Sequence, residues 1–219
     1  PDFDGALTDG FVAKIDLRTG SLVYATFLGG SQFDMLTDVT VDAEGFVYTV
    51  GHTSSEDYPV QSAFQDTYGG FQDYFVGGEN VTGDIVITKI SPDGQTLIYS
   101  TFLGGDNAEA AVSISVDEQG QALVSGTTTS DNFPLVNPIN EDRAGNRDAF
   151  VAELAADGQS LNFSTLFGGT EDEEVAGAVR GDEGSIYLAG TTWSEGLPMT
   201  TTISGELRGR SDAFLVRLK

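Results

Sequence analysis

Three carboxylates recur at the same place in a repeated sequence and could bind a hard cation. Each stands four residues after the second glycine of a Gly-Gly pair, and the three are Asp34, Glu109 and Glu173. Carboxylate and carbonyl oxygens are the ligands that calcium prefers. If the three acids approach one rim of the fold, they predict a calcium site, with calcium as the cofactor. The alternative is that they cap turns and face water, which is the commoner place for an acid.

Two further acidic sets recur, and both are interpreted as structural. The first lies in loops that end in proline, where short polar side chains satisfy backbone groups. Its members are Glu56, Asp131 and Glu195, and the apolar residues before the prolines, expected to be buried between layers of strands, are Tyr58, Phe133 and Leu197. The second set predicts turns at the start of strands, and its members are Asp9, Asp84, Asp148 and Asp212. Because every member has counterparts in other repeats, neither set marks a single active site.

The residues that nucleophilic catalysis needs are scarce. The chain has no cysteine, and none of its serines stands in a G-x-S-x-G elbow. His52 is the only histidine, and threonine holds its place in the other two repeats. We therefore interpret His52 as ordinary polar surface. The Gly-Gly pairs are not followed by the Lys-Ser/Thr of a phosphate loop, which argues against a nucleotide site.

One segment departs from the repeat and carries several aromatic side chains. Residues 69–80 fall in an insertion of the first repeat and hold Phe71, Tyr74 and Phe75 between glycines. Loops that present aromatic residues are common contact surfaces for proteins and glycans. We expect these three residues to bind a partner, and the alternative is a local lid over the edge of a layer of strands.

The positions of all these residues follow from an internal repeat. Residues 22–59, 97–134 and 161–198 align without a gap, and each stretch follows an apolar string that begins with aspartate. The repeats run over residues 9–83, 84–147 and 148–211, with the start of a fourth at 212–219. Since the chain begins at Pro1 in what reads as a loop, we expect it to be a piece of a longer protein.

Each repeat predicts four short strands. Apolar runs of about five to seven residues, rich in β-branched and aromatic side chains, are too short for helices. In the first repeat they lie near residues 11–15, 22–27, 36–41 and 46–51, and turns that end in glycine favour hairpins between them. Small side chains in the third run are typical of an innermost strand. Four-stranded antiparallel units at this period indicate β-propeller blades, so we predict an all-β fold of about three blades, partial or open.

The repeat resembles the bacterial seven-bladed β-propeller repeat family, of the SBBP type. The resemblance rests on D-A-F-V-A-x-L, on L-x-Y-S-T-x-L-G-G, and on a Val-Asp hairpin followed by T-S-x-x-x-F-P, and it spans nearly the whole chain. Arg180 and Gly181 depart from it where the second repeat has Val116 and Asp117. The resemblance implies propeller blades in a secreted or cell-surface bacterial protein, and it implies no particular activity.

The charge of the chain limits its partners. Thirty-four acidic residues against 10 basic ones give a net charge of -24, which repels nucleic acid and anionic membrane surfaces. No apolar run approaches the length needed to cross a bilayer. We expect a secreted or cell-surface protein whose partners are other protein chains or further repeats of the same chain, with glycans as a further class.

Two functions stay open at this point. The first is a non-enzymatic module that serves structure, adhesion or protein assembly, favoured by the regular repeats and the lack of a singular polar cluster. The alternative is a carbohydrate-binding or carbohydrate-active propeller, because propellers host both. A glycosidase needs two particular carboxylates about 5 to 10 Å apart, and the recurrence of nearly every acid argues against it.

Overall fold

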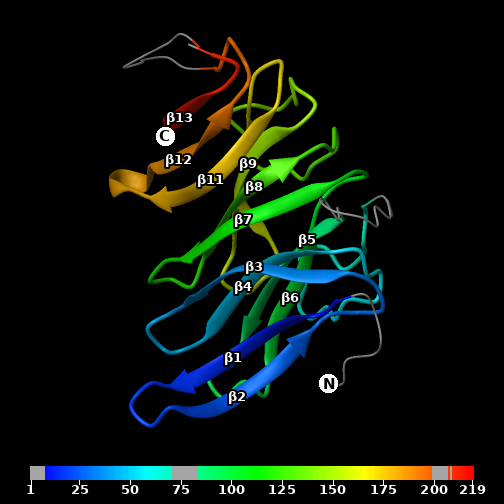
Figure 1. Cartoon of the computed structure of the whole chain (residues 1–219), viewed down its shortest axis with the longest axis vertical. Coiled ribbons are helices and arrows are strands. Elements are labelled where there is room, and N and C mark those ends of the chain that lie inside the picture. Colours follow the sequence, from blue (N-terminus) through cyan, green and yellow to red (C-terminus); the bar gives the residue numbers. More distant parts are fainter. Residues whose placement is uncertain (1–7, 71–82, 199–206, 208) are drawn as a thin grey trace.

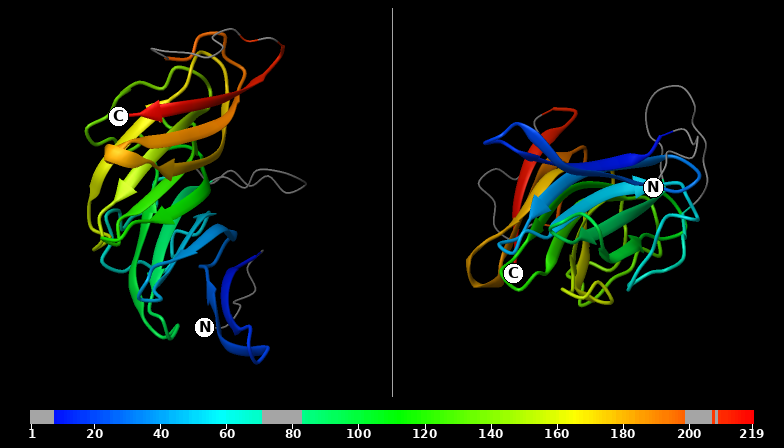
Figure 2. Two further views of the ribbon diagram at one scale, coloured as in Figure 1. Left: turned by 90° about the vertical axis from the view of Figure 1, so that its left-hand side faces the viewer. Right: turned by 90° about the horizontal axis from the view of Figure 1, so that it is seen from below.

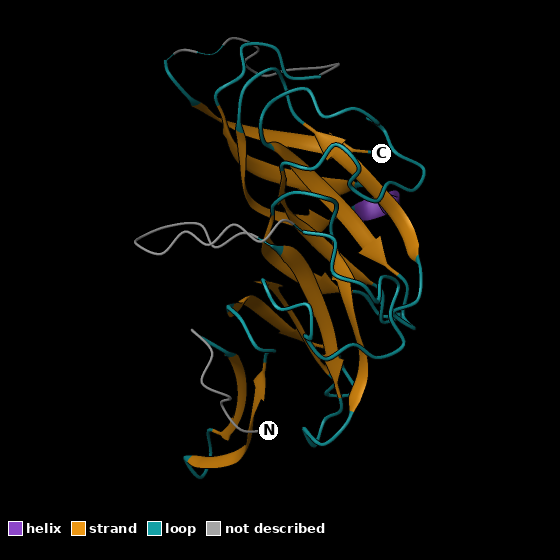
Figure 3. Ribbon diagram, turned by 90° about the vertical axis from the view of Figure 1, so that its right-hand side faces the viewer, coloured by secondary structure: helices purple, strands orange, loops and turns teal. Residues whose placement is uncertain are grey.

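The computed structural model describes residues 8–70, 83–198, 207 and 209–219, and this part of the chain consists of β-strands joined by loops (Figure 1). Within it the only helical element is η1, a single 3-10 turn at Asp182–Gly184. The prediction of an all-β fold without long helices is confirmed. Figure 3 shows the loops gathered at the ends of the strands.

The described strands form four antiparallel sheets, and neighbours in the sequence are neighbours in each sheet. The first sheet contains β1 (Gly10–Asp16) and β2 (Ser21–Leu28). The second contains β3 (Asp34–Val41), β4 (Val47–Thr53), β5 (Asp84–Ile90) and β6 (Leu97–Leu103). The third contains β7 (Glu109–Val116), β8 (Ala122–Thr128), β9 (Asp148–Leu154) and β10 (Leu161–Phe167). The fourth contains β11 (Glu173–Arg180), β12 (Ile186–Thr192) and β13 (Asp212–Leu218).

The first four strands lie within two residues of the predicted apolar runs. The sheets, however, cut across the sequence repeats. β3 and β4 come from the first repeat and β5 and β6 from the second, yet the four strands form one sheet. The strands with small side chains, such as β7, are edge strands. None of the four sheets closes on itself, because each strand order has two ends.

The hairpin turns follow the pattern of glycines. Gly45 and Gly120 end the turns between the first two strands of the second and third sheets, with φ of 89° and 81°. Glycine adopts this left-handed conformation without strain. The turn of the third repeat also ends in a glycine with positive φ, Gly184 at 74°, although it contains the 3-10 element η1. The hairpin persists there, because Arg180 still pairs with Ile186 across β11 and β12.

A glycine in the second strand of a sheet lets that strand approach a bulge in the first. In β8 this residue is Gly126, and the register with β7 shifts between Ala111 and Ser113. A Cβ at Gly126 would lie 2.1 Å from the carbonyl oxygen of Ala110, so no larger residue fits. The equivalent glycines of β4 and β12 are Gly51 and Gly190.

The sheets pack face against face in the order of the sequence, and an apolar core lies at each of the three junctions (Figure 2). The core between the first and second sheets includes Val12, Tyr24, Val86 and Phe102. The core between the second and third includes Tyr48, Ile87, Phe150 and Leu154. The core between the third and fourth includes Leu123, Val151, Leu188 and Phe214. Tyr58 and Phe133 are buried in these cores, as predicted for the residues before the prolines, whereas Leu197 is half-buried and packs against the third core.

Candidate functional site

The three recurring acids are buried, each as the first residue of an edge strand. Asp34 begins β3, Glu109 begins β7 and Glu173 begins β11, and their exposed fractions are 2%, 1% and 0%. The alternative that they face water is therefore wrong. The cause is that the loop after the neighbouring strand folds over each acid, which residue types alone do not reveal.

Hydroxyl and backbone N–H groups surround each carboxylate in the same way. The hydroxyl of Thr128 donates to Glu109 Oε1 at 2.6 Å, and the N–H of Gly105 donates to Oε2 at 3.2 Å. The equivalent donors to Glu173 are Thr192, Ser194 and Gly169, and those to Asp34 are Thr53, Ser55 and Gly30. Each acid thus ties a Gly-Gly turn to the end of the neighbouring strand, which is a capping role inside the protein.

A second carboxylate lies beside each of the three. A Cβ at Gly104 would lie 2.5 Å from Asp84 Oδ1 and 2.6 Å from Glu109 Oε2, so both oxygens press on the first glycine of the pair. The equivalent trios are Asp148, Gly168 and Glu173, and Asp9, Gly29 and Asp34. Asp84 also accepts the N–H of Gly69 at 2.8 Å, which fits its predicted place in a turn at the start of a strand.

Burial raises the pKa of these carboxyl groups. The pKa of Glu109 rises to about 7 through burial, and the neighbouring charge of Asp84 adds to the shift. Burial also raises the pKa of Asp84, to about 6. The pKa values of Asp34, Asp148 and Glu173 are raised by burial as well. In each pair, burial therefore favours the neutral, protonated form of the carboxyl groups over the charged form.

The structure does not gather the three recurring acids at one point. They begin strands of three different sheets. Over the described ranges, no group of three or more acidic, histidine or cysteine side chains is placed to hold a metal ion. Calcium binding at these acids stays a prediction. The carboxylates that could bind it lie in pairs, one pair beside each Gly-Gly turn.

Two other candidates from the sequence lie elsewhere. His52 in β4 is 8% exposed and stacks on Phe33, with ring centroids 6.2 Å apart, and burial lowers its pKa. Its interpretation as polar surface is wrong, because β4 is an inner strand covered on both faces. Phe71, Tyr74 and Phe75 lie outside the described residues.

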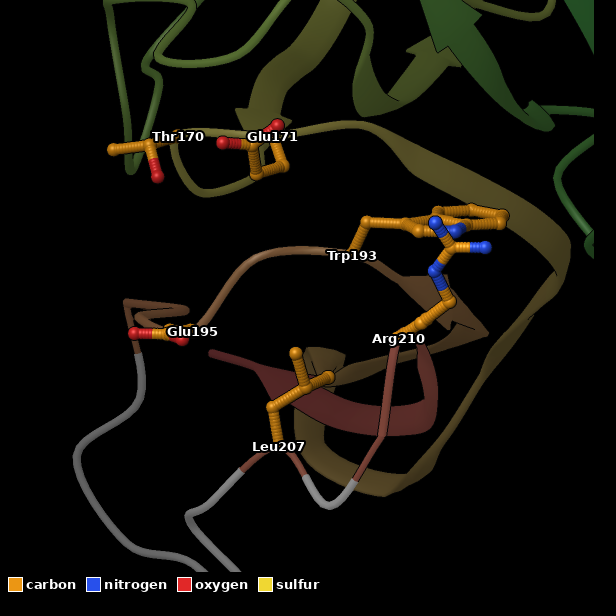
Figure 4. Close-up of a pocket in the computed structure, with 6 residues that line it drawn as sticks. All are labelled: Thr170, Glu171, Trp193, Glu195, Leu207 and Arg210. Carbon is orange, nitrogen blue, oxygen red and sulfur yellow. The ribbon is translucent and has the colours of Figure 1, made fainter.

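A pocket of about 590 Å³ lies between three loops at one end of the fourth sheet (Figure 4). Its lining comes from the loop before β11 (Thr170, Glu171), the loop after β12 (Trp193, Glu195) and the segment before β13 (Leu207, Arg210).

Of the lining residues, sequence reasoning had singled out Glu195 alone, and for a structural role. Trp193 carried a usable signal, since it is the only tryptophan and replaces a serine and a threonine of the other repeats. The sister residues Glu56 and Asp131 are exposed loop residues.

Large apolar side chains are exposed on the first and fourth sheets, at the two ends of the stack, and also on the edge strand β3. On the first sheet they include Phe11 (67% exposed), Ile15 (56%), Leu22 (62%) and Phe27 (43%). The register pairs Phe11 with Phe27 and Ile15 with Leu22, so these four share one face, here called the N-face. On the fourth sheet, Val179 (59%) and Leu215 (70%) mark the exposed C-face.

Comparison with known proteins adds no further assignment. No protein-family profile matches the chain, and no curated protein matches it either. Among the described residues there is no helix with the length and apolar character that a membrane span requires.

Proposed function

We propose that the chain is a non-enzymatic segment of a β-propeller whose two end sheets are covered by further sheets of the same kind. The four-stranded sheets are antiparallel meanders, and successive sheets pack face to face, as propeller blades do. The module would serve structure, adhesion or protein assembly, secreted by a bacterium or at its surface. The net charge of -24 suits such surroundings, where cations relieve self-repulsion.

The proposal rests on one observation. Where two inner sheets pack together, one face of the first sheet contacts the opposite face of the next, and the two end sheets leave these same two faces exposed. Phe11 of β1 is 67% exposed, whereas Phe150, at the same position of β9, is fully buried. Leu215 of β13 is 70% exposed, whereas Val151, at the same position of β9, is fully buried. One face of the repeated strand is uncovered at the first sheet, and the opposite face at the fourth.

The contacts between the inner sheets indicate which kind of surface can cover each end sheet. Ile87 of the second sheet, which corresponds to Leu215, shares a core with Phe150 of the third, which corresponds to Phe11. Val151 and Phe214 repeat this contact between the third and fourth sheets. A sheet of the same repeat therefore matches both the N-face and the C-face, and burial of their apolar side chains favours association.

A carbohydrate-active enzyme is the alternative, and the acid pairs do not favour it. Two adjacent carboxylates are the minimum for glycoside hydrolysis. Asp84 and Glu109, however, are 0% and 1% exposed, so a substrate has no access to them. Their arrangement also recurs beside Gly29 and Gly168, whereas an active site occurs once.

Sedimentation velocity of three aspartate variants tests the proposal. We expect the wild-type chain to associate as its concentration rises to about 100 μM. Phe11→Asp and Leu215→Asp should each be monomeric, because every head-to-tail contact needs one N-face and one C-face. Leu17→Asp is the matched control, since Leu17 is 93% exposed in the turn after β1 and belongs to neither face. A monomeric wild-type chain, or a control that behaves like the two face variants, would contradict the proposal.

A further inference from the structure

At one end of the third sheet, an arginine side chain fills the space between two loops. The guanidinium of Arg143 contacts the carboxylate of Asp131, with Nε at 3.0 Å and Nη2 at 2.5 Å from the same oxygen. It also donates to the carbonyl oxygens of Gly145 and Asn146. The side chain of Arg143 is only 17% exposed. The arginine thereby fills the space between the loop after β8 and the segment before β9.

In the sequence, the corresponding segments of the fourth sheet lack this arginine. The spacing of the repeat puts Leu207 where the third sheet has Arg143, and Glu195 where it has Asp131. Leucine is shorter than arginine and forms no ion pair with a carboxylate. The pocket of about 590 Å³ lies at this place, and Trp193 forms part of its wall (Figure 4). The pocket therefore lies where this repeat departs in sequence from its neighbour, at Leu207 and Trp193.

We propose that this pocket binds a neutral saccharide, in addition to the assembly role. Its volume lies within the range of about 300–1,000 Å³ typical of small-molecule sites. The indole of Trp193 offers an apolar face against which the C–H groups of a sugar ring can pack. Glu171 and Glu195 accept hydrogen bonds from sugar hydroxyls, Arg210 donates them, and the Thr170 hydroxyl does both.

The charges of the lining select among sugars. Two carboxylates and one guanidinium line the pocket, in a chain whose net charge is -24. An anionic sugar is disfavoured by this field. Glu171 and Glu195 are both exposed to water, whereas the general acid of a glycosidase is kept protonated by burial. The pocket therefore fits binding of a neutral sugar without its hydrolysis.

The fluorescence of Trp193 provides the test, because it is the only tryptophan of the chain. The probes are methyl β-glucopyranoside, methyl α-mannopyranoside, cellobiose and maltose. We expect at least one of them to shift or quench the emission with a Kd of about 1 mM. Leu207→Arg should abolish the response, because it restores the arginine that closes the third sheet's loops. Arg210→Ala should weaken binding at least about fivefold, through the loss of one charged hydrogen-bond donor.

The control is Arg143→Leu, which opens the third sheet's loops where no tryptophan stands and should leave the response unchanged. Circular dichroism checks that each variant is folded. The saccharide site is wrong if no probe changes the emission at about 50 mM, if both pocket variants bind like the wild type, or if glucuronate binds more tightly than the glucoside. The same titration on Leu215→Asp separates this result from the assembly proposal, since that variant lacks the C-face and keeps every lining residue.

Discussion

The buried carboxyl groups make the stability of this fold depend on pH. A carboxyl whose pKa is raised by folding binds its proton more tightly in the folded state than in the unfolded one. The pKa of Glu109 is about 7 in the folded protein, against an ordinary value of 4.5. The stability gained from its protonation is therefore complete below pH 4.5 and is lost as the pH rises through 7.

We predict that the free energy of unfolding falls between about pH 5 and pH 8, by roughly 2–3 kcal/mol from Glu109 alone. Glu109→Gln should remove this part of the pH dependence and be more stable than the wild type at pH 8, because glutamine fills the site without a charge. Glu118→Gln, in an exposed turn, is the control for the lower net charge. Urea unfolding at both pH values measures the effect, and an unchanged pH dependence in Glu109→Gln would count against it.

Calcium binding is the second prediction at this scale. If calcium sits at the acid pairs, it compensates the charge of the ionised carboxylates at high pH and adds about 2.7 kcal/mol at 100 times its Kd. The melting temperature at pH 8 should then rise by a few degrees relative to sodium chloride of equal ionic strength. The triple variant Asp34→Asn, Glu109→Gln, Glu173→Gln should lose this rise. If calcium raises the melting temperature of both proteins equally, or of neither, these acids have a structural role and bind no calcium.

A sequence repeat predicts that equivalent residues share one local structure, but it does not predict whether they are buried. The recurrence of Glu109 and Glu173 after Gly-Gly pairs predicts that they share one local structure, and they do. Each forms a hydrogen bond with a serine more than 20 residues away in the sequence, Ser130 for Glu109 and Ser194 for Glu173. The sequence does not indicate which side of the acid the loop with this serine covers. The burial of His52 was not predicted either, because polar residues are commoner at the surface and the sequence did not show that β4 is an inner strand.

The strands are the elements that the sequence predicted best. Their apolar runs are β-branched and aromatic, which suits pleated, half-buried surfaces, and their turns carry glycine where φ is positive. The length of the repeat does not determine which strands form one sheet, because a repeat can be taken to begin at any of its four strands. The pairing of β4 with β5 across a repeat boundary therefore could not be predicted from the period. The pocket was not predicted because its lining comes from three loops that are separate in the sequence.

The glycine opposite the bulge gives a prediction at the scale of the element. Gly126→Ala should destabilise the fold by at least about 2 kcal/mol, because the new methyl group would meet the backbone of β7. Gly196→Ala is the matched control, since nothing lies within 4 Å of a Cβ there, and it should change stability by less than about 0.5 kcal/mol. Thermal melting of both variants measures the difference, and equal melting temperatures would show that the bulge tolerates a side chain.

At the scale of the whole molecule, the exposed ends and the net charge oppose each other. The N-face and C-face expose large apolar side chains, which favour association, while a net charge of -24 on each copy opposes it. An ionic strength of about 0.15 M screens charges more than about 8 Å apart and leaves apolar contacts intact. Association of the chain should therefore strengthen as sodium chloride is added, the opposite of an interface held by ion pairs.

The two end sheets should be different and complementary, and a mixing experiment tests this most directly. Phe11→Asp keeps an intact C-face, and Leu215→Asp keeps an intact N-face. Each variant alone should sediment as a monomer, and an equimolar mixture should form a dimer of one copy of each, because one functional N-face then meets one functional C-face. A mixture that stays monomeric while the wild type associates, or a single variant that dimerises with itself, would contradict the account.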